Sequence, residues 1–269
     1  MRAETNTPED NKIQEVLKHV KNRLLVFSGK GGVGKSTVAT NLALALSEKN
    51  LKVGLMDVDF HGPSLAKMLG VENCKLHATE HKITPMSITK NLKLVSMAFF
   101  LDKLDDPVIW RGPLKMKAIQ QFIEDVEWGE LDWLICDSPP GTGDEPLSVA
   151  HLIPATGAVI VTTPQEVALL DSRKAISFAQ MLNLKILGVI ENMSGFICPH
   201  CGERTDLFKS GGGERIAAEY HVPFLGRIPI DPGIVDSGDN GQPFSFSRKD
   251  SAAAKAFAEI VDLISINSI

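Results

Sequence analysis

The chain has 269 residues, of which 43% are hydrophobic and 23% charged, and its formal net charge at neutral pH is −5. These values are typical of a globular protein that can bury a full core. The charge balance argues against a nonspecific nucleic-acid binder and no apolar run approaches a membrane span, so we expect no nucleic acid and no membrane as partners.

The N-terminal residues predict a short helix rather than a targeting signal. They lack the basic start and apolar core of a signal peptide. Ile13, Val16, Leu17 and Val20 fall on one helical face, which predicts an amphipathic helical extension within residues 1–22. The four cysteines, without an export signal, indicate the reducing cytoplasm rather than a disulfide framework.

Apolar strands alternate with helical patterns along the rest of the chain. The predicted strands are RLLVFSG (23–29), LKVGLMDVD (51–59), NLKLVSM (91–97), LDWLICDSP (131–139), GAVIVTTP (157–164), LKILGVIEN (184–192) and VPFLGRIPI (222–230). The predicted helices cover residues 36–50, 64–70, 113–126, 144–151, 166–183, 211–220 and 251–266. This alternation predicts an α/β fold, a three-layer α/β/α sandwich with a doubly wound, mostly parallel sheet and its site at the carboxyl edge. Without repeats or a convincing linker, residues 23–269 are predicted to form a single domain.

The stretch VFSGKGGVGKSTVA (26–39) contains the phosphate-binding pattern G-x-x-x-x-G-K-[ST] between a predicted strand and a predicted helix. Glycines let the backbone N–H groups turn toward phosphate oxygens, and the helix dipole adds to the attraction. We expect Lys35 to contact the β- and γ-phosphates of a nucleotide and the Ser36 hydroxyl to bind Mg²⁺. The predicted phosphate-binding residues are Gly29, Lys30, Gly31, Gly32, Val33, Gly34, Lys35, Ser36 and Thr37.

Carboxylates follow two of the predicted strands. Asp57 and Asp59 stand two residues apart at a strand end, on the same side, and Asp137 ends another apolar strand in the Walker B position. A single Asp at a strand end more often caps a helix. Three of them beside a phosphate loop favour a site for magnesium and water.

A second lysine, Lys30, stands at the entrance of the phosphate loop. It precedes the turn that carries Lys35 and does not fold back easily onto the same phosphates. It is therefore either an ordinary solvent-exposed lysine or a cation offered to the nucleotide of a second subunit, as an arginine finger acts in trans.

The motifs resemble those of a known family. KGGVGKST (30–37) resembles the deviant Walker A of the SIMIBI-class P-loop NTPases, which include the MinD, ParA, ArsA and nitrogenase iron protein families. DVDFHGPS, DSPPGTGDEPLS and GVIENMSGFICPHCG together resemble the Mrp/ApbC-type iron–sulfur cluster carrier ATPases, over residues 22–265. The resemblance implies an ATPase that forms an ATP-sandwich homodimer, in which Lys30 reaches the phosphates bound by the partner. We expect slow turnover, because nothing in the sequence indicates a pocket for a high-flux substrate.

The resemblance also implies roles for single residues. Asp59 would lie near the attacking water, Asp57 near magnesium, and Asp137 in Walker B. The expected catalytic residues are thus Lys30, Lys35, Asp59 and Asp137. The adenine contacts that the resemblance implies are Asn192, Pro229 and Asp231.

The stretch CPHCG (198–202) is a CxxC knuckle that supplies half of a metal site. Zinc and iron–sulfur sites take four such ligands. Cys136 lies in a predicted buried strand and Cys74 is isolated, so a second copy of the chain across a twofold axis completes the site most simply. The resemblance implies the same arrangement, a [4Fe–4S] cluster held by Cys198 and Cys201 of both subunits.

Several alternatives for the knuckle remain open. Zinc suits four thiolates equally well, C-P-H-C also occurs in oxidising thioredoxin-fold enzymes, and the knuckle could be purely structural.

The motifs and the resemblance together lead us to expect an ATP-hydrolysing carrier that takes a cluster from donors and transfers it to apo iron–sulfur proteins. The alternative function is a MinD/ParA-like ATP-driven dimerisation switch with a structural zinc knuckle. A reductase like the nitrogenase iron protein is disfavoured, because the cluster cysteines of that family do not form a CxxC pair.

Overall fold

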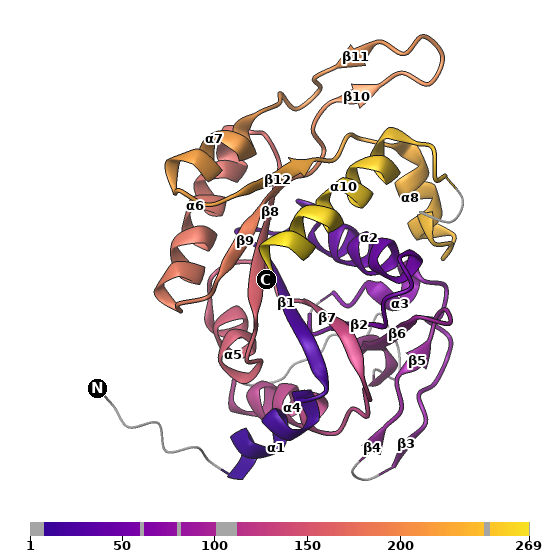
Figure 1. The fold of residues 1–269 in the computed structure, drawn as a ribbon, viewed down its shortest axis with the longest axis vertical. Coiled ribbons are helices and arrows are strands. Elements are labelled where there is room, and N and C mark those ends of the chain that lie inside the picture. Colours follow the sequence, from indigo (N-terminus) through magenta and orange to yellow (C-terminus); the bar gives the residue numbers. More distant parts are fainter. Residues whose placement is uncertain (1–7, 60–61, 80–81, 101–111, 245–247, 269) are drawn as a thin grey trace.

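An eight-stranded sheet forms the centre of the molecule (Figure 1). The computed structural model describes residues 8–59, 62–79, 82–100, 112–244 and 248–268. The strands of the sheet are β1 (Val20–Ser28), β2 (Val53–Asp57), β5 (Met86–Ser87), β6 (Leu92–Ser96), β7 (Leu131–Asp137), β8 (Gly157–Thr162), β9 (Ile186–Glu191) and β12 (Phe224–Arg227). They lie in the order β12-β9-β8-β1-β7-β2-β6-β5, and all neighbouring pairs are parallel except β5–β6. The predicted doubly wound, mostly parallel sheet is confirmed.

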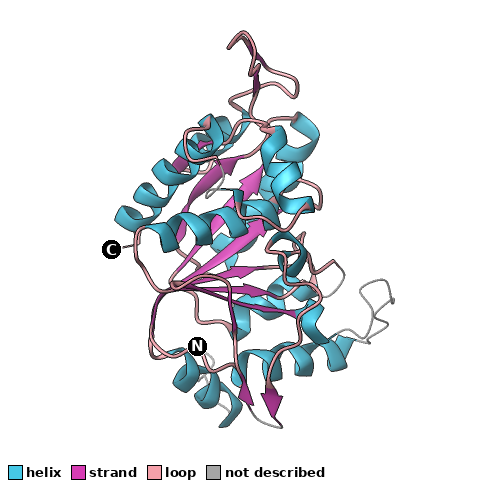
Figure 2. Cartoon of the chain, turned by 90° about the vertical axis from the view of Figure 1, so that its right-hand side faces the viewer, coloured by secondary structure: helices cyan, strands magenta, loops and turns pink. Residues whose placement is uncertain are grey.

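Helices cover both faces of this sheet (Figure 2). They are α1 (Pro8–Leu17), α2 (Lys35–Glu48), α3 (Leu65–Met68), α4 (Gly112–Glu124), α5 (Asp144–Leu152), α6 (Glu166–Met181), α7 (Gly212–Glu219), α8 (Pro232–Asp239) and α10 (Ala252–Asn267), with a 3-10 turn at Met97–Phe100. Side chains of β1 alternate between two cores, so that Leu24 and Val26 pack toward α2, α3 and α10. Leu25 and Phe27 pack on the opposite face, toward α1 and α4–α7. None of the described helices has the length and apolar character needed to cross a lipid bilayer.

The first strand begins earlier than predicted. β1 starts at Val20 rather than Arg23, so the boundary expected between residues 22 and 23 falls inside a strand. Val20 was expected on the helical face, but its backbone pairs with Leu131 of β7. The helix itself ends at Leu17 and packs against the body through this residue and Ile13, which are both buried.

A helix and several short strands were not expected from the sequence. α8 follows β12 after the short segment 228–231, with Asp231 as its N-cap and Pro232 in its first turn. Residues 76–87 contain a small hairpin, β3 (Ala78–Thr79) with β4 (Lys82–Ile83), before β5. A second hairpin, β10 (Phe196–Ile197) with β11 (Arg204–Thr205), projects from the body at the top of Figure 1.

The parallel strands bring several polar residues to one edge of the sheet. β1 leads into the phosphate loop, β2 ends at Asp57, β7 at Asp137 and β9 at Glu191. Asp57 and Asp137 are register partners across β2 and β7. The fold therefore gathers at the carboxyl edge residues that are far apart in the sequence.

Replacing a central core residue is expected to be costly. Leu25 is fully buried in β1, so Leu25→Ala loses apolar burial and leaves a cavity. We expect the free energy of unfolding to fall by about 2–5 kcal/mol, measured by urea unfolding of the nucleotide-free, metal-free chain.

The matched control is Leu170→Ala, because that leucine on α6 is 60% exposed. Its effect should stay within about 0.5 kcal/mol. Equal losses for the two variants would show that the sheet core is not where the structure places it.

Candidate nucleotide site and thiol half-site

The loop between β1 and α2 has the close-packed backbone of a phosphate-binding loop. Gly32 and Gly34 adopt left-handed φ angles of 80° and 82°, and Gly34 is the N-cap of α2. A Cβ atom at Gly34 would lie 2.2 Å from Asn192 Nδ2, and one at Gly29 would lie 2.1 Å from the Asp171 carbonyl oxygen. Only glycine fits these positions, and the loop ends at a helix N-terminus, which attracts phosphate.

Lys35 and Asp137 form a buried ion pair next to this loop. Lys35 Nζ lies 2.6 Å from Asp137 Oδ1, and the two side chains are 6% and 1% exposed. Burial raises the pKa of the Asp137 carboxyl, and the Lys35 ammonium opposes that rise. Asp137 Oδ2 is buried and has no hydrogen-bond partner among the described residues. One carboxylate oxygen therefore remains for a ligand.

Asp57 is also buried, but both of its oxygens are engaged by the chain. Its Oδ2 accepts hydrogen bonds from Ser96 Oγ at 2.9 Å and from the Leu65 N–H at 3.3 Å. Its Oδ1 accepts one from the Asp59 N–H at 3.2 Å. Burial, followed by the charge of Asp137, raises the pKa of Asp57 to about 7. Asp57 thus organises the segment that leads from β2 to α3.

The oxygen atoms present fit a magnesium ion. Ser36 Oγ lies 3.4 Å from Lys35 Nζ, which itself contacts Asp137. The hydroxyl and the unpartnered Asp137 oxygen are hard ligands of the kind that Mg²⁺ prefers. Asp59 is also buried at this edge, and its Oδ1 accepts a hydrogen bond from the Gly62 N–H at 3.3 Å. The expected magnesium ligation by Asp57 stays a prediction, and Asp137 is the carboxylate with an oxygen to spare.

Lys30 lies half-buried at the entrance of the loop. Ser28 Oγ donates a hydrogen bond to its carbonyl oxygen at 3.0 Å, which holds the backbone. The Lys30 ammonium forms no ion pair or hydrogen bond with any residue of the described ranges. Its expected contact with a partner's nucleotide remains a prediction.

The residues expected at the adenine lie close to the loop or just after β12. Asn192 Nδ2 donates a hydrogen bond to the Val33 carbonyl oxygen at 2.9 Å. Asp231 accepts one from the Gly233 N–H at 2.8 Å and thereby caps α8. Pro229 lies in the segment between β12 and α8. Their contacts with adenine stay predicted, while Asn192 is shown to support the phosphate loop.

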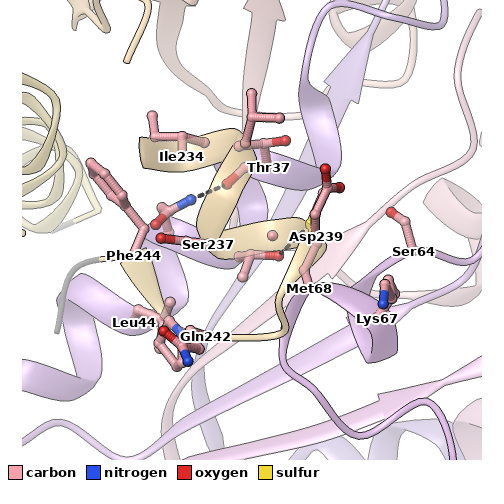
Figure 3. A pocket seen from close by; sticks show the side chains of 15 residues that line it. Thr37, Leu44, Ser64, Lys67, Met68, Ile234, Ser237, Asp239, Gln242 and Phe244 are labelled. Carbon is pink, nitrogen blue, oxygen red and sulfur yellow. Dashed lines mark hydrogen bonds between the residues drawn. The ribbon is translucent and has the colours of Figure 1, made fainter. Parts of the chain in front are cut away.

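A pocket of about 320 Å³ adjoins the helix that follows this loop (Figure 3). Thr37 of α2, Met68 of α3 and Ile234 of α8 are among the side chains around it. Thr37 is one of the predicted phosphate-binding residues. None of the three predicted adenine contacts lines this pocket.

Cys198 and Cys201 lie in the turn of the projecting β10–β11 hairpin (Figure 1). The Cys198 N–H donates to the Glu203 carbonyl oxygen, and the Gly202 N–H donates to the Cys198 carbonyl oxygen, both at 2.9 Å. Hydrogen bonds from the backbone N–H groups of Cys201 and His200 lower the pKa of the Cys198 thiol. The turn therefore favours the thiolate, which is the form that binds metals.

One chain supplies only two thiols to this site. No three Cys, His, Asp or Glu side chains of the described residues come close enough to hold a metal ion. Cys136 is buried in β7, where burial raises the pKa of its thiol, and Cys74 is exposed outside the hairpin. Ile197, Leu207 and Phe208, close to the cysteines in the sequence, are 40%, 58% and 41% exposed. Exposed apolar side chains around an incomplete ligand set are typical of a contact surface for another chain.

Glu191 is a buried carboxylate that the sequence analysis missed. It ends β9 as Asp57 and Asp137 end β2 and β7. Its two oxygens accept hydrogen bonds from the N–H groups of Gly211 and Gly213. The signal in the sequence was the same as for the two aspartates, an acidic residue at the end of an apolar strand.

Comparison with known proteins agrees with this geometry. Residues 19–265 match the family model described as ParA, NUBPL iron-transfer P-loop NTPase. The chain belongs to this family. The predicted resemblance to iron–sulfur carrier ATPases of the P-loop class is thereby confirmed.

Relatives of this iron-transfer NTPase occur in archaea and yeast. The iron–sulfur cluster carrier protein of Saccharolobus solfataricus is 50% identical over 256 residues, 95% of this chain and 86% of the relative. The cytosolic Fe–S cluster assembly factor CFD1 of Kluyveromyces lactis is 50% identical over 259 residues, 92% of each chain. A solved nucleotide-binding protein from Archaeoglobus fulgidus, in complex with ADP, is 39% identical with a TM-score of 0.78, covering 88% of this chain and 93% of that one.

Removing Lys35 should destabilise the nucleotide-free protein. Lys35→Met leaves the buried Asp137 charge without its partner, and we expect the free energy of unfolding at neutral pH to fall by about 3–5 kcal/mol. The control is Lys82→Met, because Lys82 and Glu127 are 65% and 52% exposed, and an exposed pair contributes about 1 kcal/mol or less.

The loss in Lys35→Met should also depend on pH. Burial holds the folded-state pKa of Asp137 above its unfolded value, and removing the lysine raises it further. In the variant, the folded state therefore binds the Asp137 proton more tightly than the unfolded chain does. The loss in the free energy of unfolding is greatest above the folded-state pKa of Asp137 and shrinks as the pH falls through it. Urea unfolding at about pH 5 and pH 8 measures this, and an equal loss at both would contradict the buried-charge account.

Proposed function

We propose that this protein is an ATP-dependent iron–sulfur cluster carrier, which holds a [4Fe–4S] cluster between two copies of the chain and transfers it to apo-proteins. The observation that carries the proposal is the CxxC half-site, with Cys198 half-buried and Cys201 exposed, on a projecting hairpin of a P-loop NTPase. The printed names of the relatives, iron–sulfur cluster carrier protein and cytosolic Fe–S cluster assembly factor, support it.

The cluster is the cargo of this site. Four thiolates bind a [4Fe–4S] cluster, and two chains related by a twofold axis supply them from one knuckle each. The lowered pKa of Cys198 favours ligation. The exposed apolar residues of the hairpin, Ile197, Leu207 and Phe208, would become buried between the two copies.

The nucleotide site supplies the energy. The glycine loop binds the phosphates, and Lys35 exchanges its contact with Asp137 for the β- and γ-phosphates. The Ser36 hydroxyl and the carboxylates of Asp57 and Asp137 would hold Mg²⁺. When bound, the ion neutralises charge on the phosphates. Asp59 orients the attacking water, and Lys30 stabilises the charge that develops on the nucleotide of the partner copy.

ATP and the cluster both require the dimer. In a single chain, Lys30 lacks its nucleotide contact and the cysteine pair lacks two of the four cluster ligands. ATP binding and slow hydrolysis would therefore rearrange the two copies and regulate the loading and release of the cluster. The recipients are apo iron–sulfur proteins, and other proteins donate the cluster. We place this work in the cytoplasm, in line with the printed name of the yeast relative.

Cysteine replacement tests the cargo site. After anaerobic reconstitution with iron and sulfide, the double variant Cys198→Ala with Cys201→Ala should hold no cluster and transfer none to an apo-acceptor. It should bind nucleotide like the parent protein, because the hairpin projects away from the sheet edge. Iron analysis, visible absorption and acceptor activity measure these outcomes.

Cys74→Ala is the matched control, because it removes an exposed cysteine outside the hairpin and should load iron normally. A full cluster in the double variant would refute the assignment. Tightly bound zinc that iron cannot displace from the parent protein would make the knuckle a structural clasp.

Lys30 should matter only between copies. Lys30→Ala should lose nucleotide-dependent dimerisation and slow ATP hydrolysis by about tenfold or more, while nucleotide binding by the single chain changes little. Lys255→Ala, an exposed lysine on α10, serves as the control. Sizing with a nonhydrolysable ATP analogue and a phosphate-release assay test this, and dimerisation with normal turnover in Lys30→Ala would contradict it.

A further inference from the structure

The hairpin that carries the two cysteines is fastened to the body at both ends by one carboxylate, that of Glu191. On the side where the hairpin begins, Ser194 Oγ donates a hydrogen bond to Glu191 Oε1 at 2.6 Å. On the side where it returns, the Gly211 N–H donates to Oε1 at 2.9 Å and the Gly213 N–H to Oε2 at 2.5 Å. Glu191 is fully buried. Arg227 Nε lies 3.7 Å from Oε1 and adds an ion pair. A buried carboxylate with three hydrogen-bond donors, two of them at the start of α7, and a nearby guanidinium is a strongly held group.

Hydrogen bonds continue from Glu191 into the hairpin itself. Ser194 Oγ and Ser210 Oγ lie 3.2 Å apart. Since Ser194 gives its only hydroxyl proton to Glu191, Ser210 must be the donor in this pair. Arg204 Nη2 in turn donates to Ser210 Oγ at 3.1 Å, and Arg204 lies in β11, opposite Ile197 of β10. The direction of the hairpin is thus linked to the Glu191 carboxylate.

The residue after Glu191 touches the phosphate loop. Asn192 Nδ2 donates to the Val33 carbonyl oxygen at 2.9 Å, and its backbone N–H donates to the Thr162 carbonyl oxygen at 2.8 Å. Gly34 packs so closely that an added Cβ would lie 2.2 Å from Asn192 Nδ2. Any shift of the loop around a phosphate must therefore move Asn192 or break its hydrogen bond.

We propose that Glu191 is a positioning residue that sets the direction in which the hairpin presents Cys198 and Cys201, and that its link through Asn192 makes this direction depend on the nucleotide in the phosphate loop. Glu191 thus holds the hairpin with the two cysteines, and the next residue, Asn192, holds the phosphate loop. The inference rests on the proposed function for the use of the cysteines. Its test needs no cluster.

The reactivity of the two thiols reports on the hairpin. We would use the full chain, reduced and metal-free, with Cys74→Ser. The thiols left for the reagent are then those of Cys198, which is half-buried, and Cys201, which is exposed, while Cys136 is fully buried. The rate of reaction with a dithionitrobenzoate reagent is measured without nucleotide and with a nonhydrolysable ATP analogue and Mg²⁺. A coupling of ordinary size changes this rate by about fivefold or more.

Glu191→Gln should abolish the nucleotide effect on the thiols. The amide presents its own N–H donors to the three donors that now face the carboxylate, so at least one contact is lost. The nucleotide dissociation constant should stay close to that of the parent, because Glu191 does not face the loop. Ser194→Ala, which breaks the link to Ser210 and Arg204 but keeps the carboxylate, should reduce the effect in the same direction and serves if Glu191→Gln does not fold.

Glu219→Gln is the matched control. Glu219 is an exposed carboxylate on α7 that pairs with Arg173 of α6, and neither residue forms a hydrogen bond or an ion pair with Glu191 among the described residues. It should keep the full nucleotide effect. An unchanged effect in Glu191→Gln and Ser194→Ala, or thiols of the parent that ignore nucleotide, would overturn the inference and leave the cluster proposal standing. Failure to bind iron would instead refute the cluster proposal and leave the thiol result intact.

Discussion

The nucleotide site depends on the parallel pairing of β2, β7 and β1. Parallel strands end at the same edge, so the phosphate loop after β1 comes to lie beside the last residues of β7 and β2. The register then sets Asp57 directly opposite Asp137. Burial raises the pKa of both carboxyls, and the charge of Asp137 adds to the rise in the pKa of Asp57. The ammonium of Lys35 and the hydrogen bonds to Asp57 are what make this arrangement tolerable in a dry interior.

The candidate nucleotide site and the cysteine half-site differ in burial, and in each case the degree of burial suits the proposed chemistry. The carboxylates beside the phosphate loop are buried and held by hydrogen bonds, which favours a fixed geometry for the proposed phosphoryl transfer. The cysteines stand on an exposed hairpin, where another chain can reach them. Exposure suits the proposed release of a cluster, and burial suits the proposed hydrolysis, which must exclude bulk water. Glu191 and Asn192 lie between the two, at the end of one strand.

Local signals made much of the site predictable. The glycines and Lys35 form a contiguous pattern, Asp57 and Asp137 end apolar strands, and the spacing of Cys198 and Cys201 is typical of a metal knuckle. These features depend on residues close in the sequence, so no knowledge of packing was needed. The same holds for the sheet, whose strands are continuous apolar runs because helices cover both faces.

What could not be predicted depends on contacts between distant segments. Val20 joins a strand because its backbone pairs with Leu131. The residues next to it in the sequence give no sign of this, because Val20 continues the apolar pattern of the preceding helix. α8 follows β12 after only the short segment 228–231, and its N-cap, Asp231, was interpreted as a nucleotide contact. The partners of Glu191 come from the two ends of a hairpin that the sequence shows only as a loop. Lys35 was assigned to phosphate, and its pairing with Asp137 follows only from the register of β7 beside β1.

The central claim is that two chains share one cluster, and native mass spectrometry of the reconstituted protein tests it most directly. The account predicts a species of two chains with four irons and four sulfides, which separates into cluster-free single chains when the cluster is removed. A single chain that retains a complete cluster, or a dimer with a separate metal ion on each chain, would contradict it.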